Sequence, residues 1–524
     1  MKIYSFSPFG YEGALVTVEV DLRRGIPAVD IVGLADGAVK ESRERMQAAI
    51  RNSSFDFPPE RVLISLSPAD LKKEGAGFDL PIALGVLAAN AEGKGETSFI
   101  TDSILVMGEL ELSGKIRPVK GVHAAVSTAI SCGIKMCIVP WQNADEAREA
   151  GSVMVYGADT LENAFRALKD FSFYEKSRIS DFPEDKVIPE DCEESGGLLF
   201  QKKSEGFEFG EIKGQYKLIR ALEIAACGGH NLIAIGAPGC GKTMAIQKFP
   251  AINPVLRPEE AQSVTRIWSL AGLIKPSQPL VRIPPFRMPH QTASIEGICG
   301  GGVNCRPGEI SLAHHGVLFL DEASEFRSSV LQMLRVPLEN KSITLCRAGR
   351  STCYPADFQL FMAVNPCPCG NFGSKSKICL CSTKSIELFW KKFSAPLLDR
   401  IDLRVFVSRG EDQGQREELI TTDEIRKKIA MAVKFMRKRQ NCKNQNLQPE
   451  DIALYCTQDD ESKNAIAAAV NRYSFSPRTV ASCVKVARTI ADLELSEIIR
   501  GNHMKESIEY HKLCNNMLPL TDDL

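Results

Sequence analysis

The chain has 524 residues, with 64 Lys and Arg against 65 Asp and Glu, and its formal net charge is -1 at pH 7. Hydrophobic residues make up 44% of the sequence and charged residues 25%, which excludes a mainly disordered chain and predicts about two to four globular domains. The near-zero charge argues against a globally basic nucleic-acid-binding protein, although it permits a local basic surface.

The sequence carries no signal for a membrane or for secretion. No run approaches the roughly 20 consecutive apolar residues of a membrane-spanning helix, and residues 1–6 lack the apolar core of a secretion signal. We therefore expect a cytoplasmic protein with no membrane partner. The count of 17 cysteines is odd, and without a secretion signal most of them are expected to be reduced thiols.

Residues 1–171 are predicted to form one α/β domain. Period-two alternation, buried apolar runs and helical spacing predict strands at residues 14–20, 61–67, 104–107 and 135–139 and helices at 41–52, 80–90 and 122–132. Residues 172–206 are acidic and contain several Pro and Gly residues, which predicts a surface linker.

The rest of the chain divides into two further parts. Residues 207–405 alternate between strands and helices, as in a doubly wound nucleotide-binding domain. Residues 406–524 are predicted to form a helical lid, with helices at 425–440, 462–471, 479–493 and 498–513. Basic residues between positions 426 and 443 are expected to form a solvated helix face or a DNA contact.

A phosphate-binding loop is the strongest motif in the sequence. Its residues fit G-x-x-x-x-G-K-[ST] and are Gly236, Ala237, Pro238, Gly239, Cys240, Gly241, Lys242 and Thr243. An apolar strand at 231–235 leads into the loop, and a helix can follow it. The glycines let backbone N–H groups converge on phosphate oxygens, Lys242 is predicted to reach the β- and γ-phosphates of ATP, and Thr243 is predicted to bind Mg²⁺.

Two further apolar strands end in polar residues. Residues 317–320 are followed by Asp321, which we expect to bind through the magnesium shell, and by Glu322, which we expect to polarise the attacking water. Residues 358–364 lead to Asn365, which is expected to orient the water or touch the γ-phosphate. The sequence therefore predicts an ATPase site that uses ATP and Mg²⁺.

Two arginines are candidates for sensing the nucleotide. Arg400 can act as an arginine finger on a neighbouring subunit, or it can form an ion pair with Asp399 or Asp402 in its own chain. Arg478 starts a predicted helix and can close the lid over nucleotide, or it can be a surface residue at the helix end.

Together these motifs resemble the magnesium-chelatase-like AAA+ ATPases, and more narrowly their YifB/ComM branch. The resemblance rests on residues 285–290, 300–302, 306–314, 398–400 and 488–493, and on residues 31–34, 39–45 and 68–81 of the N-terminal part. It implies a ring-forming ATPase, typically a homo-hexamer, in which Arg400 matches the arginine finger and Arg478 the second sensor arginine. For the ComM members it implies a DNA helicase that promotes branch migration during integration of transforming DNA.

The N-terminal part also resembles the proteolytic domain of Lon. Residues 73–78 are similar to the nucleophile loop of Lon, and residues 108–115 and 118–123 to its lysine segment. Here the nucleophile position is Gly77 and the lysine position is His123. Because glycine has no nucleophilic side chain, we expect a Lon-like fold without peptidase activity.

Residues 342–354 are predicted to form a β-hairpin, because polar and apolar residues alternate on both sides of Ala348 and Gly349. The family resemblance implies that a hairpin at this place faces the central pore. Arg347 and Arg350 at its tip can then contact DNA phosphates, or they can be ordinary solvated arginines.

Four cysteines form a C-x-C-x9-C-x-C pattern, namely Cys367, Cys369, Cys379 and Cys381. Four thiolates can hold a structural Zn²⁺, although C-x2-C spacing is more usual. The alternative is four reduced thiols or a redox-sensitive loop.

Two classes of function remain open at this point. The first is a DNA-remodelling motor that acts on single-stranded or branched DNA. The second is a chelatase-type or chaperone-type ATPase that remodels a protein partner. The Lon-like part favours the first, because a magnesium-chelatase motor subunit lacks it.

Overall fold

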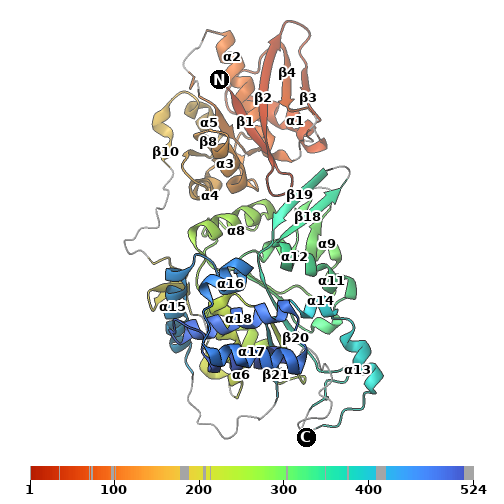
Figure 1. Ribbon diagram of the computed structural model, residues 1–524. Helices are drawn as coiled ribbons and strands as arrows, with labels where there is room; N and C mark the ends of the chain where they lie inside the picture. The colour runs from red at the N-terminus through yellow and green to blue at the C-terminus, as the bar shows by residue number, and fades with distance from the viewer. Residues whose placement is uncertain are drawn as a thin grey trace.

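The computed structural model describes residues 2–34, 36–69, 71, 73, 75–95, 99–100, 102–176, 188–203, 208–212, 214–302, 305–347, 350–373, 377–408 and 420–512. Figure 1 shows an N-terminal part, red to orange, above a lower part in which the helical C-terminal segment, in blue, packs on the nucleotide-binding segment. Among the helices within these residues, none is long and apolar enough to cross a membrane.

The N-terminal part is built on a mixed eight-stranded sheet with the order β10-β9-β8-β5-β1-β2-β4-β3. Its strands are β1 (Ile3–Ser7), β2 (Ala14–Arg23), β3 (Val29–Val32), β4 (Arg61–Ser67), β5 (Ile104–Val106), β8 (Met136–Pro140), β9 (Met154–Ala158) and β10 (Glu175–Lys176). Its helices are α1 (Gly37–Asn52), α2 (Asp79–Gly93), α3 (Val122–Ser131), α4 (Ala144–Glu149) and α5 (Leu161–Ala167), and a small ribbon joins β6 (Glu109–Leu110) to β7 (Ile116–Arg117).

The second sheet has five parallel strands in the order β14-β17-β20-β13-β21. They are β13 (Leu232–Gly236), β14 (Phe286–Arg287), β17 (Val317–Leu320), β20 (Gln359–Val364) and β21 (Leu403–Val407). The helices of this part are α6 (Tyr216–Gly228), α7 (Lys242–Gln247), α8 (Pro258–Ala271), α9 (Ile295–Cys299), α10 (Glu309–Leu312), α11 (Ser328–Met333), α12 (Arg335–Asn340), α13 (Thr383–Trp390) and α14 (Ala395–Leu398). Two short pairs complete it, β15 (Gly300–Gly301) with β16 (Arg306–Pro307) and β18 (Ser342–Arg347) with β19 (Arg350–Pro355).

The central strand β13 is apolar along its whole length because both of its faces are covered. Leu232 and Ala234 belong to one hydrophobic cluster, and Ile233 and Ile235 belong to another. Successive side chains of a strand point to opposite faces, so a doubly covered parallel strand is expected to have this pattern. The predicted doubly wound α/β fold is confirmed.

The C-terminal helices share the first of these clusters with the sheet. They are α15 (Thr422–Arg439), α16 (Pro449–Tyr455), α17 (Asp460–Tyr473), α18 (Pro477–Leu493) and α19 (Gly501–His511). Ile429 of α15 and Ile490 of α18 are fully buried in the cluster that contains Phe361 of β20. This shared core attaches the lid directly to the nucleotide-binding sheet.

Part of the predicted acidic linker at 172–206 is wrong. Residues 192–201 form a hairpin of β11 (Cys192–Ser195) and β12 (Leu198–Gln201), and Phe200 is fully buried in the core of the nucleotide-binding part. Arg426, expected on a basic surface, is 1% exposed and pairs with Glu193 of this hairpin. Residues 177–187 of the predicted linker lie outside the described residues.

Helix α8 connects the two parts. It lies at the top of the nucleotide-binding part, below α3 and α4 of the N-terminal part (Figure 1), and packs against α3. Its Gln262 Oε1 lies 2.7 Å from Nε2 of His123, and its Ser269 hydroxyl donates to Glu146 over 2.5 Å. Arg266 donates from Nε to the carbonyl oxygen of Tyr11 over 3.0 Å.

Candidate active site

The phosphate loop joins β13 to α7, in the strand–loop–helix context that the sequence predicts. Gly239 and Gly241 have φ angles of 72° and 88°, in the left-handed region that favours glycine. A Cβ on Gly236 would lie 2.2 Å from the carbonyl oxygen of Val407, so a side chain is excluded there. The loop thus presents bare backbone at the carboxyl edge of the sheet.

Lys242 is held inside this loop. Its ammonium donates to the carbonyl oxygens of Gly236 over 2.6 Å and Ala237 over 3.0 Å, and it lies 3.7 Å from Sγ of Cys240. Burial lowers the pKa of Lys242, since a desolvated ammonium loses hydration. These contacts within the protein therefore hold the Lys242 side chain at the phosphate loop.

The acidic residues follow β17, two strands from β13 in the sheet. Oδ1 of Asp321 accepts hydrogen bonds from the hydroxyl of Thr243 over 2.9 Å and from the backbone N–H of Glu322 over 3.0 Å. Glu322 has a φ angle of 47°, which is unusual for a residue with a side chain and is frequent at functional sites. Its side chain is exposed, so it remains accessible to solvent at the sheet edge.

Asn365 directly follows β20, the strand between β17 and β13. Val364 pairs with Ile235, so Asn365 comes one residue beyond this pair, beside the start of the phosphate loop. It is half-buried. Thr243, Asp321, Glu322 and Asn365 therefore share one edge of the sheet.

Arg400 and Arg478 meet elsewhere, at Glu339 of α12. Arg400 pairs with one carboxylate oxygen of Glu339, and NH1 of Arg478 lies 3.4 Å from the other. The expected alternative for Arg400, an ion pair with Asp399 or Asp402, is not the contact observed. Within the described residues, no hydrogen bond or ion pair joins either arginine to the phosphate loop.

The residues present fit ATP with magnesium. A hydroxyl and a carboxylate already meet at 2.9 Å beside a glycine-lined loop, and oxygen ligands of this kind suit Mg²⁺. Thr243 and Asp321 are the residues that would hold the ion.

Comparison with known proteins decides the family. Models of the magnesium chelatase subunit ChlI match residues 18–143 and 208–415, and a model of its C-terminal part matches residues 420–511. The chain is 34% identical over 523 residues to the uncharacterized protein YifB of Escherichia coli, covering 99% of this chain and 98% of that protein. It is 34% identical over 524 residues to competence protein ComM of Haemophilus influenzae, covering 99% of both.

The chain belongs to the YifB/ComM branch of the magnesium-chelatase-like AAA+ ATPases.

The N-terminal part of this YifB/ComM protein is Lon-like. The chain is 23% identical over 154 residues to a Lon protease of Desulfovibrio desulfuricans, which is 28% of this chain and 16% of that protein. Gly77 lines a cavity of about 360 Å³ between the two parts of the molecule. His123 is 1% exposed against Gln262, and burial lowers its pKa to about 4, so it is a neutral contact between domains.

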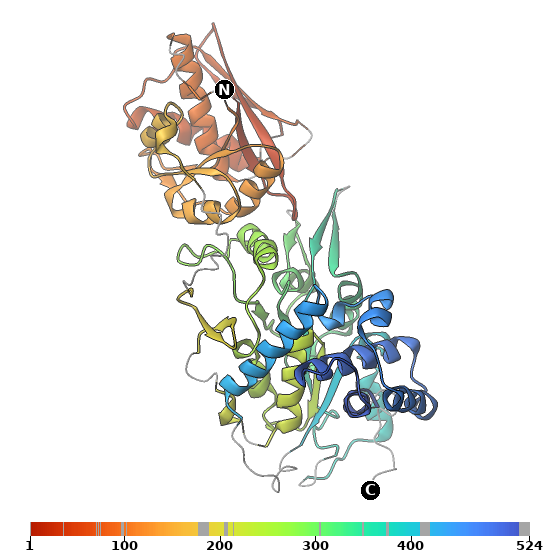
Figure 2. The same ribbon diagram turned by 60° about the vertical axis from the view of Figure 1, so that its left-hand side comes forward.

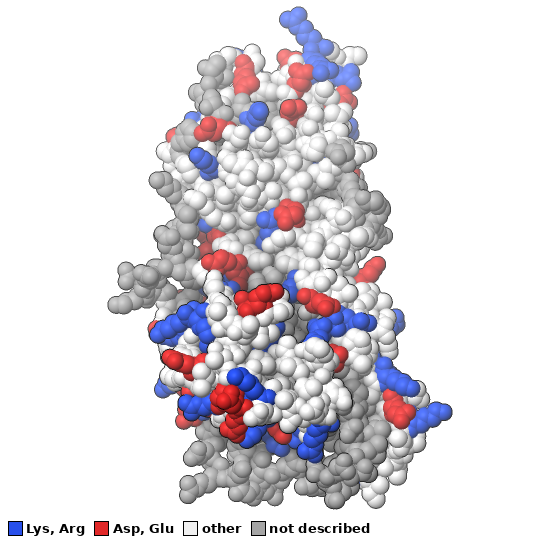
Figure 3. All heavy atoms as spheres, in the orientation of Figure 1, with Lys and Arg blue, Asp and Glu red and all other residues white. Residues whose placement is uncertain are grey.

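The hairpin predicted at 342–354 is confirmed as β18–β19, with Arg347 and Arg350 paired across its end. It rises from the nucleotide-binding part toward the N-terminal part (Figures 1 and 2), where the backbone N–H of Tyr11 donates to the hydroxyl of Thr352 over 3.2 Å. On the face of the YifB/ComM protein shown in Figure 3, basic and acidic side chains of the described residues are interspersed, mainly over its lower half.

The four cysteines come together in the loop after Asn365. The sulfur of Cys367 lies 3.4 Å from that of Cys369 and 3.7 Å from that of Cys379, and with Cys381 all four lie within 4.8 Å of one another. Sulfur ligands placed tetrahedrally at 2.3 Å from zinc are about 3.8 Å apart. The backbone N–H of Phe372 also donates to the sulfur of Cys367 over 3.4 Å.

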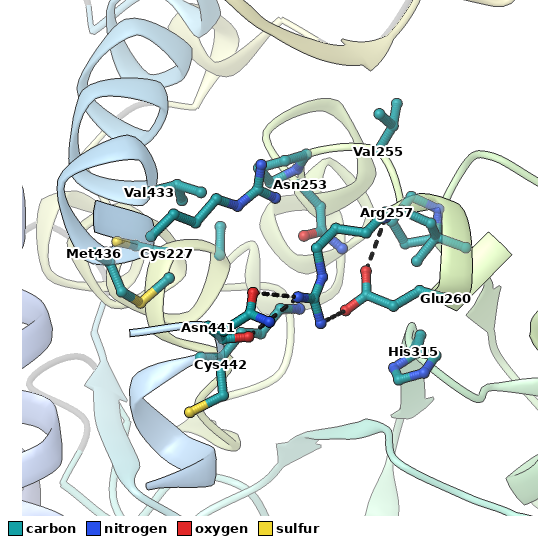
Figure 4. Close-up of a pocket in the computed structure, with 16 residues that line it drawn as sticks. Cys227, Asn253, Val255, Arg257, Glu260, His315, Val433, Met436, Asn441 and Cys442 are labelled. Atoms are coloured by element: carbon teal, nitrogen blue, oxygen red, sulfur yellow. Dashed lines mark hydrogen bonds and ion pairs between the residues drawn. The ribbon is translucent and has the colours of Figure 1, made fainter. Parts of the chain in front are cut away.

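Another hollow, between α15 and α8, is drawn in Figure 4. Arg257 crosses it and donates to the backbone and side-chain oxygens of Asn441 over 3.1 and 3.2 Å and to Glu260 over 3.0 Å. The volume of this hollow, about 40 Å³, is far below the usual size of a ligand pocket. None of the residues predicted for the nucleotide site lines it, and the hydrogen bonds of Arg257 across it join the lid to the core.

Two contacts were not foreseen from the sequence. Glu339 joins the two candidate arginines, and Gln262 meets His123 across the two parts of the molecule. Both join residues more than 60 positions apart in the sequence, so no local pattern indicates them.

Proposed function

We propose that this chain assembles into a ring, hexameric as is typical of its family, that uses ATP hydrolysis to remodel DNA. Within one subunit, Lys242 binds the β- and γ-phosphates, Asn365 orients the attacking water, and Glu322 takes its proton. Thr243 and Asp321 would hold a magnesium ion, which when bound would supply positive charge near the phosphate oxygens. The hydrogen bond between Thr243 and Asp321 is the observation that carries the ATPase assignment.

In this proposal, Arg400 completes the nucleotide site of the neighbouring subunit. Arg478, at the start of α18 in the lid, responds to nucleotide bound in that site. The lack of any contact between either arginine and its own phosphate loop, among the residues described, favours this arrangement. We assign the nucleotide core to residues 207–405 together with the 192–201 hairpin, the lid to 406–524, and a Lon-like domain without peptidase activity to 1–171.

We propose DNA as the substrate, in the form of single strands or branched recombination intermediates. The relative ComM is called a competence protein, which associates this branch with uptake of DNA. In the sequence, the β18–β19 hairpin lies between β17, which precedes the two acidic residues, and β20, which precedes Asn365. Arg347 and Arg350 are at the end of this hairpin. Helicase action with branch migration in the cytoplasm is the activity that follows from this substrate.

Stimulation of ATP hydrolysis by nucleic acid tests this substrate. We expect turnover to rise with single-stranded DNA or a four-way junction. In binding titrations, Arg347→Ala with Arg350→Ala should reduce the slope of log affinity against log salt by about 2, roughly one for each phosphate contact.

The matched control is Arg23→Ala with Arg61→Ala, since these arginines also face each other across an antiparallel pair, in the N-terminal sheet. The control should keep the wild-type slope. Turnover that no DNA changes, together with stimulation by an unfolded protein, would instead support the protein-remodelling alternative.

We also propose that Cys367, Cys369, Cys379 and Cys381 hold a structural zinc ion. This loop packs on the phosphate loop, because a Cβ on Gly370 would lie 2.6 Å from Cδ of Pro238. Trp390 anchors the start of the loop by donating to the carbonyl oxygen of Pro366 over 3.0 Å. Zinc would therefore stiffen a wall of the nucleotide site without taking part in the reaction.

Metal analysis tests this site. We expect about one zinc ion per chain. Cys379→Ser should lose the metal and weaken ATP binding, because the loop no longer supports Pro238, while Cys132→Ser, at an exposed cysteine of the N-terminal part, should change neither. Wild-type protein that stays free of zinc after supplementation would contradict the proposal.

A further inference from the structure

Glu339 occupies an unusual position for a residue on a short surface helix. Its side chain is 54% exposed, yet each of its carboxylate oxygens is engaged by a different arginine, Arg400 on Oε2 and Arg478 on Oε1. These arginines are 61 and 139 positions away in the sequence, one in the nucleotide core and one at the start of α18 in the lid. One carboxylate thus joins core and lid.

The contact determines where the Arg400 guanidinium points. Its side chain is only 9% exposed, and NH1 donates to the carbonyl oxygen of Pro396 over 2.5 Å. The second partner is Glu339, through NH2. Nε has no partner among the described residues. With one neutral acceptor and one charged acceptor, the carboxylate contributes most of the orienting force.

The cluster keeps a net positive charge. Two guanidinium groups face one carboxylate, and hydrogen bonding to Arg400 lowers the pKa of Glu339, so the acid stays ionised. Each guanidinium carries five N–H donors, and the contacts to Glu339 use few of them. The pair can therefore keep Glu339 and still receive phosphate oxygens from a neighbour.

The helix that carries Glu339 leads directly into the β18–β19 hairpin. Lys341, with a φ angle of 53°, ends α12, and β18 begins at Ser342. The other end of the hairpin returns to the same residue, because the backbone N–H of Ala356 donates to the carbonyl oxygen of Lys341 over 2.8 Å. Both strands of the hairpin therefore meet at Lys341, two residues after Glu339.

We infer that Glu339 is a positioning residue that holds Arg400 and Arg478 as a pair facing the nucleotide of the neighbouring subunit. The inference rests on the proposed role of Arg400. Its effect on the reaction passes through the arginines, since Glu339 itself touches neither substrate nor metal ligand. It also gives the hairpin a direct connection to the arginine that completes the next active site.

Glu339→Gln in the full-length protein tests the inference. We expect kcat to fall roughly 10- to 100-fold, as for groups displaced by about 1 Å, with the KM for ATP nearly unchanged. Glu339→Asp should recover part of the rate. Added to Arg400→Ala, Glu339→Gln should cost nothing further, because both remove the same function. Glu387→Gln on α13, an exposed glutamate, is the matched control.

Three results would overturn the role of Glu339: wild-type or faster turnover of Glu339→Gln, losses that multiply in the double variant, or a rise in KM instead of a fall in kcat. A different result bears on the proposed function itself. If Arg400→Ala alone hydrolyses ATP at the wild-type rate, Arg400 is not the finger, whatever Glu339→Gln does.

Discussion

Glu322→Gln is expected to bind ATP as the wild type does and to hydrolyse it roughly 10²–10⁴-fold more slowly, the usual contribution of a general base. The amide keeps the size of the side chain but cannot take a proton. Asp321 remains paired with Thr243, so the metal ligands are untouched. Equilibrium binding of a fluorescent ATP analogue and steady-state hydrolysis measure the two effects separately.

Lys242→Ala is the contrasting variant for this prediction. It removes the ammonium that lies within 3.0 Å of the loop carbonyls and should lower ATP affinity itself. Equal loss of affinity in both variants would contradict the division of roles between the lysine and the glutamate.

Arg400→Ala is expected to bind ATP nearly normally and to lose roughly 10³–10⁵ in turnover, the value of an arginine finger in other NTPases. Lys242, Thr243, Asp321 and Glu322 align the nucleotide, but the charge that builds on the γ-phosphoryl group needs a further cation. The guanidinium of Arg400 is held by Pro396 and Glu339 and by no residue of its own phosphate loop among those described. Binding titrations alongside hydrolysis assays distinguish this result from loss of folding or of affinity.

The phosphate loop and its neighbours were predictable because their signals are local. The glycines of the loop with the apolar strand before them, and the acids at the end of the apolar strand β17, are each visible within a few residues. Strand β4 has the bounds predicted from alternation alone, at 61–67. Helix α1 begins at Gly37, four residues before the prediction, because Asp36 caps it by accepting from the N–H of Val39 over 2.8 Å.

What the sequence could not provide are contacts between distant residues. The sequence predicts Arg426 on a basic surface. In the structure it is buried and pairs with Glu193, which is 233 positions away. Phe200 lies in an acidic stretch without apolar periodicity, yet it fills the core of the next part of the chain. Glu339 is an ordinary acid on a short helix until the fold brings two arginines to it.

Mixing two inactive variants tests most directly the claim that active sites are shared between subunits. Arg400→Ala subunits retain Glu322, and Glu322→Gln subunits retain Arg400. Where the nucleotide site of the first meets the arginine of the second, one site is complete. The account predicts that mixed rings recover a measurable fraction of wild-type ATP hydrolysis, while each variant alone stays inactive. If mixed rings demonstrably form and hydrolysis does not return, Arg400 acts within its own chain and the shared-site account is wrong.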